Sequence, residues 1–246
     1  MPSPAADAPR PEQAFNVTAL KWHTCAWLLL PVLAFMAGWM RWYAALPLML
    51  LLAAGLAPPR RKELMKREVL PAFPLFTRSS FLALAAFTAL MALSGWGEWV
   101  NQHPDHIVRN ACLRELAASP WPVVFPDGDA LIYNTGFWLV PALAGKLAGL
   151  DAAGAVVVLW GAWGLFLAWL WLCVFSGRRS LLLVLLMVMF GSLLNVQCWL
   201  GLDLFRLHYF GTAEQIMCSA NASIPVMLFF IFLASGRMPL HWMPLL

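Results

Sequence analysis

The chain has 246 residues, of which 62% are hydrophobic and only 11% are charged. A soluble domain is about half apolar and about a quarter charged, so this composition excludes a soluble globular protein, and the mean hydropathy of +0.73 agrees. The net charge of +4 does not point to nucleic acid, because the positions of Lys and Arg in a membrane protein report its topology. The sequence predicts an all-α, multi-pass integral membrane helical bundle that contacts membrane lipid and no nucleic acid.

The cysteines are scattered and form no CxxC pair: Cys25, Cys112, Cys173, Cys198 and Cys218. Most lie in or beside apolar runs, where cysteine behaves as a small hydrophobic residue, so we expect neither a disulfide framework nor a zinc site. A polar tail rich in Pro and Ala precedes the first apolar run, which lacks an A-x-A cleavage site. We therefore predict a cytoplasmic tail over residues 1–21 and a transmembrane domain over residues 22–246.

The first apolar run, residues 25–56, is longer than the roughly 20 residues that one span needs. Because Arg41 interrupts it, two short helices joined in a tight hairpin at Arg41 are expected rather than one helix with a buried arginine. Five of the 16 basic residues follow between positions 60 and 67. Such a block marks the cytoplasmic side, and the hairpin before it places the N-terminus on the same side.

The next apolar run, residues 75–96, crosses outward to the longest polar stretch, residues 97–130, which holds five acids and two arginines. A loop so poor in Lys and Arg is predicted to be extracytoplasmic. The run 131–150 is either a span or a juxtamembrane or re-entrant helix at the outer face. The second alternative is preferred, because it leaves Arg178 and Arg179 on the cytoplasmic side.

With that choice, the remaining runs cross at 152–175, 180–202 and 222–234, and residues 203–221 form a second outer loop. The chain then has about six spans plus one outer juxtamembrane helix. Its apolar end without a polar tail is typical of a fragment of a longer protein.

The outer loop is expected to contain an amphipathic helix from Pro104 to about Ser119. Proline suits the first turn of a helix because its missing N–H would be unpaired there, and Pro120 and Pro122 end the helix. The polar strip of this helix consists of Asp105, His106, Arg109, Asn110 and Arg114, and its apolar side of Ile107, Val108, Ala111, Cys112 and Leu116. This pattern predicts a helix on the membrane surface whose ionisable groups face water or a cleft.

Asp105 has two interpretations. It is the candidate catalytic residue, a general base that deprotonates a hydroxyl acceptor in a partly desolvated site. Alternatively, it is an acid in the first turn of a helix, stabilised by the helix dipole and paired with Arg109 four positions later. Spacing alone favours the second interpretation.

Other residues of the outer face also have both a functional and a structural interpretation. His103, Asp105 and His106 lack a standard ligand spacing, so no metal site is expected. Arg109, Arg114 and Arg206 are suited to bind a phosphate or to anchor the chain at the interface. The tryptophans at the proposed outer boundary indicate an aromatic belt or, less directly, a surface for sugar stacking: Trp96, Trp99, Trp121 and Trp138.

Several motifs follow one another in a known order. They are Asp105 with Arg109-Asn110, Pro120-Trp121-Pro122-Val123, Leu131 to Gly136, Pro141 to Gly149 with its Gly-Lys-Leu-x-Gly pattern, and Gly177-Arg178-Arg179. This order, between Ser94 and Asp203, resembles the amino-terminal half of the GT-C-fold glycosyltransferases. These are polytopic membrane enzymes that use polyprenyl-phosphate-linked sugars. The chain is shorter than members of that family, so a truncated or partial relative is expected.

The resemblance implies transfer of a hexose or pentose from a polyprenyl-phosphate donor to a hydroxyl acceptor at the outer face, without a cofactor. It implies that Asp105 is the catalytic acid of the first outer loop. Arg109 and Arg114 would lie near the donor phosphate, and Asn110 and Tyr133 would orient the substrates. The alternative is a non-catalytic membrane protein, a subunit or fragment, whose polar strip contacts other proteins. A transporter is disfavoured. Transporters usually place ionisable groups in mid-span, and this sequence has almost none there.

Overall fold

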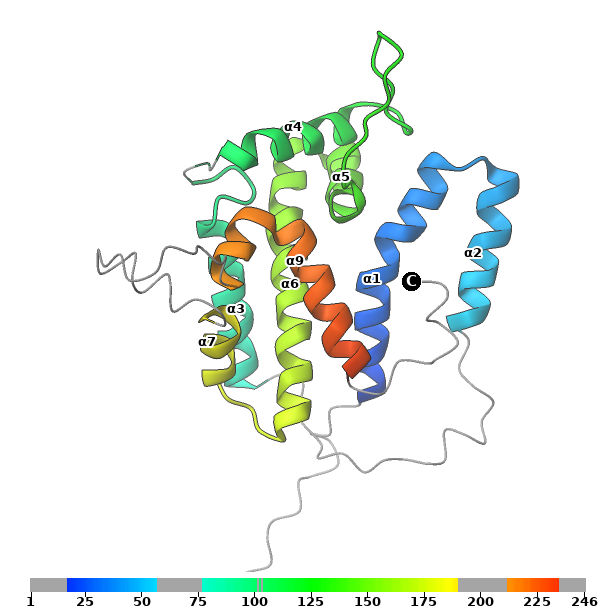
Figure 1. Cartoon of the computed structure of the whole chain (residues 1–246). Helices are drawn as coiled ribbons and strands as arrows, with labels where there is room; N and C mark the ends of the chain where they lie inside the picture. Colours follow the sequence, from blue (N-terminus) through cyan, green and yellow to red (C-terminus); the bar gives the residue numbers. More distant parts are fainter. Residues whose placement is uncertain (1–16, 57–76, 101, 103, 190–211, 235–246) are drawn as a thin grey trace, which may run out of the picture.

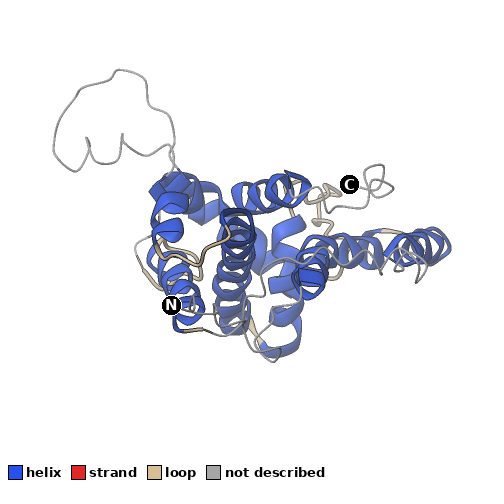
Figure 2. Ribbon diagram, turned by 90° about the horizontal axis from the view of Figure 1, so that it is seen from below, coloured by secondary structure: helices blue, strands red, loops and turns tan. Residues whose placement is uncertain are grey.

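The computed structural model describes residues 17–56, 77–100, 102, 104–189 and 212–234. Its helices are α1 (Val17–Trp39), α2 (Trp42–Leu56), α3 (Arg78–Leu93), α4 (Pro104–Ala118), α5 (Gly136–Ala148), α6 (Leu150–Ser176), α7 (Leu182–Met189) and α9 (Thr212–Ala234). Within these ranges no strand is formed, and only an isolated antiparallel bridge joins Val124 to Ala130 (Figure 2). The prediction of an all-α fold is confirmed.

The hairpin at the N-terminal end is formed as expected from the charge in its apolar run. α1 ends at Trp39 and α2 begins at Trp42, so Arg41 lies in the break. The Arg41 guanidinium is exposed and donates a hydrogen bond to the Tyr43 hydroxyl at 3.4 Å. A charge that would be costly inside an apolar helix is thereby placed at the turn. In Figure 1 α2 lies at the edge of the bundle, beyond α1.

α6 is the central helix of the bundle (Figure 1). Its 27 residues extend about 40 Å, and its side chains Trp169, Trp171, Leu165 and Leu167 are almost completely buried. Gly161 lets α3 approach closely, because a Cβ atom there would lie 2.2 Å from the Met91 Cε. The apolar core therefore forms around α6, which also fixes the positions of the shorter helices.

Two helices among the described residues are long and apolar enough to cross a membrane: Ala19–Trp39 and Leu150–Ser176. The other apolar helices are shorter: Trp42–Ala54, Arg78–Leu93, Gly136–Ala148 and Ala220–Ile231. The expected count of about six spans is therefore not established by helix length.

The C-terminal runs are described only in part. α7 begins the run predicted over 180–202, but residues 190–211 lie outside the described residues. α9 begins at Thr212, inside the stretch 203–221 that was expected to be a loop. The last apolar run is thus preceded by about ten further helical residues.

α4 and α5 cap the bundle at the N-terminal end of α6, which we call the α4 end (Figure 1). α4 has the bounds that its flanking prolines predict. α5 has 13 residues, or about 20 Å, which is shorter than the roughly 30 Å of a bilayer's hydrocarbon core. Gly145 of α5 lies where α4 and α6 meet, because a Cβ atom there would lie 2.8 Å from the Ala117 Cβ and 3.0 Å from the Ala153 Cβ.

Candidate functional site

Three of the five residues in the polar strip of α4 face the protein interior, whereas Asp105 and Arg114 are exposed. His106, Arg109 and Asn110 are buried, whereas Ile107 on the same helix is 66% exposed and Val108 is 58% exposed. A surface helix of a soluble protein has the opposite arrangement. The exposed apolar pair is suited to a lipid interface, and the buried polar groups organise the α4 end of the bundle.

Arg109 lies between Asp105 and an aromatic core. Its Nη2 atom is 3.5 Å from the Asp105 Oδ2, and its side chain is 9% exposed while that of Asp105 is 51% exposed. The guanidinium carbon lies 5.8 Å from the centroid of the Trp96 ring, a distance typical of a cation–π contact. The His106 ring also packs on Trp96, at 5.3 Å between ring centroids. Asp105 therefore lies at the exposed edge of a buried cluster.

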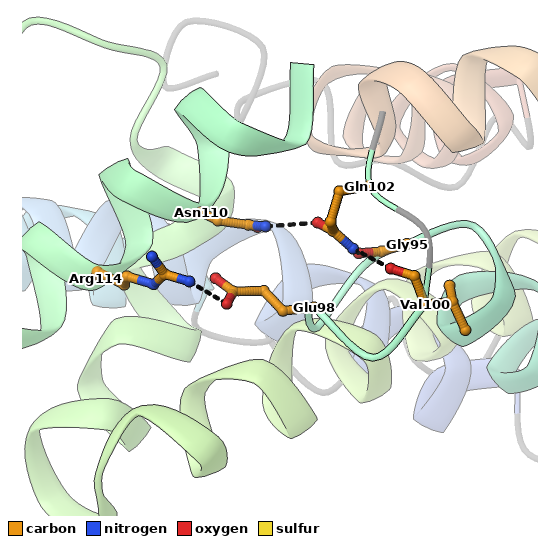
Figure 3. Close-up of polar contacts among 6 residues, drawn as sticks. All are labelled: Gly95, Glu98, Val100, Gln102, Asn110 and Arg114. Carbon is orange, nitrogen blue, oxygen red and sulfur yellow. Dashed lines mark hydrogen bonds and ion pairs between the residues drawn. The ribbon is translucent and has the colours of Figure 1, made fainter. Parts of the chain in front are cut away.

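Asn110 connects α4 to the loop that follows α3 (Figure 3). Its Nδ2 donates to the Gln102 Oε1 at 2.7 Å. Gln102 in turn donates from Nε2 to the carbonyl oxygens of Gly95 at 2.9 Å and Val100 at 2.6 Å. Gln102 was not selected from the sequence, and its role depends on this tertiary contact. The amide of Asn110 thus fixes the loop.

Arg114 forms an ion pair with Glu98 from the same loop (Figure 3). Glu98 has a φ of 68°, a left-handed conformation that is unusual for a residue with a side chain. The loop is also pressed onto α6, since a Cβ atom on Gly154 would lie 3.1 Å from the Gly97 carbonyl oxygen. The carboxylate of Glu98 is therefore presented to Arg114 by a tightly folded backbone.

A cavity of about 480 Å³ opens beside this ion pair. Its walls are Gly97, Glu98, Trp99, Asn110, Leu113, Arg114, Leu150, Asp151, Gly154 and Val157. They combine a guanidinium and two carboxylates with aliphatic side chains from α4 and α6. Such a surface is suited to an amphiphilic ligand, one part polar and one part apolar.

The structure brings only some of the predicted site residues to this cavity. Asn110 and Arg114 line it, whereas Asp105, Arg109 and Tyr133 do not. Tyr133 lies partly exposed in the segment before α5. His103 and Arg206, weighed above as a metal ligand and a phosphate ligand, lie outside the described residues. Among the residues that are described, no group of three or more His, Cys, Asp or Glu could hold a metal ion.

The four tryptophans at the proposed outer boundary differ in exposure. Trp96 and Trp138 are buried in the core, with ring centroids 5.3 Å apart. Trp121 donates its indole N–H to the Leu116 carbonyl oxygen at 2.8 Å. Trp99, in contrast, is 57% exposed and lines the cavity. Of the four tryptophans, Trp99 is the most exposed.

Asp151, like Glu98, is a charged cavity residue that the sequence did not single out as a site residue. It lies in the first turn of α6, and the only local signal for it was an acid at the start of a long apolar run. Such an acid is ordinarily explained by the helix dipole. Its position in the wall of the cavity that Arg114 also lines depends on the packing of α4 against α5 and α6, which no spacing rule reports.

Comparison of the chain with known proteins adds no family assignment. No family model, curated protein or solved structure matches it. The resemblance to GT-C-fold glycosyltransferases stays a prediction that rests on the motifs quoted above.

Proposed function

We propose that this chain is a membrane glycosyltransferase-like protein, whole or partial, that takes a sugar from a polyprenyl-phosphate donor and transfers it to a hydroxyl acceptor. In this proposal the chain lies in the cell membrane with about six spans, its N-terminus is cytoplasmic, and the α4 end is extracytoplasmic. The supporting observation is the cavity of about 480 Å³, in which Arg114 lies among carboxylates and apolar walls.

Arg114 binds the donor phosphate. Its side chain is 57% exposed, and a guanidinium has five N–H donors, so the pairing with Glu98 leaves donors for a phosphate ester. Leu113, Leu150 and Val157 line the same cavity and accommodate the first part of the polyprenyl chain. A single lipid phosphate thereby contacts both the charged and the aliphatic walls of the cavity.

The transfer needs no nucleotide, because the lipid phosphate is the leaving group. The acceptor oxygen forms a bond to the anomeric carbon of the sugar, and the bond from that carbon to the phosphate oxygen breaks. The electron pair leaves with the phosphate, whose negative charge Arg114 stabilises. The hydroxyl proton passes to Asp105, the base in this proposal.

Asp105 suits an acceptor that approaches from outside. Its side chain is 51% exposed, and it lies nine positions before Arg114, about 14 Å along the helix axis. Arg109 positions Asp105 through the contact at 3.5 Å, and Asn110 and Tyr133 are assigned to the orientation of the substrates.

The test is sugar transfer by the purified protein in lipid nanodiscs, with polyprenyl-phosphate sugars as donors and lipid-linked hydroxyl compounds as acceptors. Asp105→Asn is expected to abolish transfer while donor binding is retained, and Arg114→Gln to weaken donor binding. Asp127→Asn, in the exposed turn after α4, is the matched control and retains transfer. An unsubstituted protein that neither binds nor transfers these donors would contradict the proposal.

A non-catalytic membrane protein is the second candidate, and one observation favours it. Asp105 is paired with Arg109 and does not line the cavity, as expected for an acid that only stabilises the start of a helix. In that case Asp105→Asn lowers the stability of α4 slightly, by less than about 1 kcal/mol. Thermal unfolding and donor binding, measured on the same variant, separate the two candidates.

A further inference from the structure

We infer that Asp151 and Trp99 form the subsite for the sugar of the lipid-linked donor. Both line the cavity that contains Arg114, but neither carries a role in the reaction described above. The inference rests on the proposed function and assigns the two ends of its substrate to different walls. The phosphate lies at Arg114, and the sugar lies between Asp151 and Trp99.

The charges of the cavity support this order. Glu98 and Arg114 neutralise each other in their ion pair. The Asp151 carboxylate makes no hydrogen bond or ion pair with any residue in the described part of the chain. The wall around Asp151 therefore carries an uncompensated negative charge. A phosphate placed there would be repelled, whereas an uncharged group that donates hydrogen bonds would be attracted.

Sugar hydroxyl groups meet this requirement. A carboxylate accepts hydrogen bonds at both of its oxygens, and hydrogen bonds to an ionised acceptor are stronger than those between neutral groups. Asp151 lies in the first turn of α6, where the helix dipole stabilises a negative charge. The carboxylate can therefore hold two neighbouring hydroxyl groups without a cation beside it.

Trp99 supplies the second contact that a sugar requires. The residue is 57% exposed and lines the cavity wall. Covering an exposed aromatic side chain removes apolar surface from water, which is favourable. A ligand that packs on Trp99 gains this contribution. The face of a sugar ring presents C–H groups that pack on an aromatic ring, while its hydroxyl edge turns to the carboxylate. Asp151 and Trp99 together thus suit the two sides of one sugar.

Two contacts join the loop that carries Trp99 to α4 and α6. The preceding residue, Glu98, has a left-handed backbone conformation and forms an ion pair with Arg114. Gly97 lies against Gly154, which is about one turn after Asp151 on α6. The loop that carries Trp99 is therefore tied to the helix that carries Asp151. A fixed spacing between the two side chains lowers the entropy cost of binding a rigid ring.

The experiment compares donors with and without the sugar. Equilibrium binding to the full chain in nanodiscs is measured with polyprenyl-phosphate glucose, mannose and arabinose, and with plain polyprenyl phosphate. Asp151→Asn is expected to weaken the best sugar-bearing ligand about tenfold and to leave plain polyprenyl phosphate unchanged. Trp99→Ala should have a similar selective effect, and Trp99→Phe should restore part of the binding.

Controls separate the possible failures. Arg114→Gln is expected to weaken both kinds of ligand, and Asp127→Asn neither. If the unsubstituted protein binds plain polyprenyl phosphate as tightly as every sugar-bearing form, or if Asp151→Asn and Trp99→Ala weaken both kinds equally, the sugar subsite is wrong while the phosphate site stands. If the unsubstituted protein binds none of these lipids, the proposed function and the subsite are both wrong.

Discussion

Glu98 and Arg114 form an ion pair across 16 positions of the chain and join the loop after α3 to the middle of α4. The pair lies at the wall of the cavity, so it both shapes the site and shares the cation that we assign to the donor phosphate. Because Glu98 also has a left-handed backbone, its side chain and its conformation can be tested separately.

Removing the charge of Glu98 should favour anionic ligands. In Glu98→Gln the guanidinium of Arg114 loses its carboxylate partner, and plain polyprenyl phosphate is expected to bind about threefold more tightly, an effect of less than 1 kcal/mol. Thermal stability should change little, because exposed ion pairs contribute about 0–1 kcal/mol. Weaker binding would mean that Glu98 holds Arg114 in its binding position.

The backbone of Glu98 predicts an unusual order of stability. At a φ of 68° a glycine is favoured over an alanine by about 1 kcal/mol, although glycine ordinarily costs stability. Glu98→Gly should therefore be more stable to denaturant than Glu98→Ala, since both lack the ion pair. Equal stability, or the reverse order, would show that the left-handed conformation is not maintained in solution.

Gly154 should be required for the shape of the cavity. A Cβ atom there would lie 3.1 Å from the Gly97 carbonyl oxygen, so Gly154→Ala pushes the loop away from α6. We expect a loss of about 1 kcal/mol in stability and weaker binding of sugar-bearing lipid. Gly136→Ala is the matched control, because nothing lies within 4 Å of the added atom. If Gly154→Ala leaves the binding of sugar-bearing lipid unchanged, the position of the loop against α6 does not determine binding at the site.

The buried thiol of Cys112 should make both alkylation and stability depend on pH in a defined way. The thiol is buried, and burial raises its pKa from 9.0 to about 11. In a variant with Cys112 as its single cysteine, alkylation should remain slow up to about pH 10, whereas a cysteine at position 127 reacts readily near pH 9. The unfolded thiol ionises first as pH rises, so this contribution to stability is complete below pH 9 and is lost towards pH 11. Fast alkylation near pH 8 would mean that α4 does not pack as described.

The sequence was sufficient where a local rule decides the structure. A charged Arg41 in an apolar run located the hairpin, and Pro104 and Pro120 bounded α4, because each acts on its own backbone. The site depended on contacts between distant segments. Glu98 and Asp151 carry no motif, and they become wall residues only when α4, α5 and α6 pack together.

The polar strip of α4 shows the same limit. Its spacing was recognised, but spacing does not say which side of a helix is covered. Arg109 was assigned to a phosphate, and the structure packs it on Trp96, where the cost of burying a cation is offset by the ring and by Asp105. The separation of Asp105 from the cavity likewise follows from the rotation of α4 about its axis.

The most direct test of the account is the side of the membrane on which the cavity opens. Asp127 is exposed in the loop after α4, and Ser176 is exposed at the C-terminal end of α6. Single cysteines at these two positions are treated in a cysteine-free background with a membrane-impermeant reagent on intact cells. The account predicts labelling at position 127 and none at position 176, with labelling of both after the cells are opened. Labelling of both positions on intact cells, or of position 176 alone, would contradict an extracytoplasmic α4 end and with it the proposed transfer at the outer face.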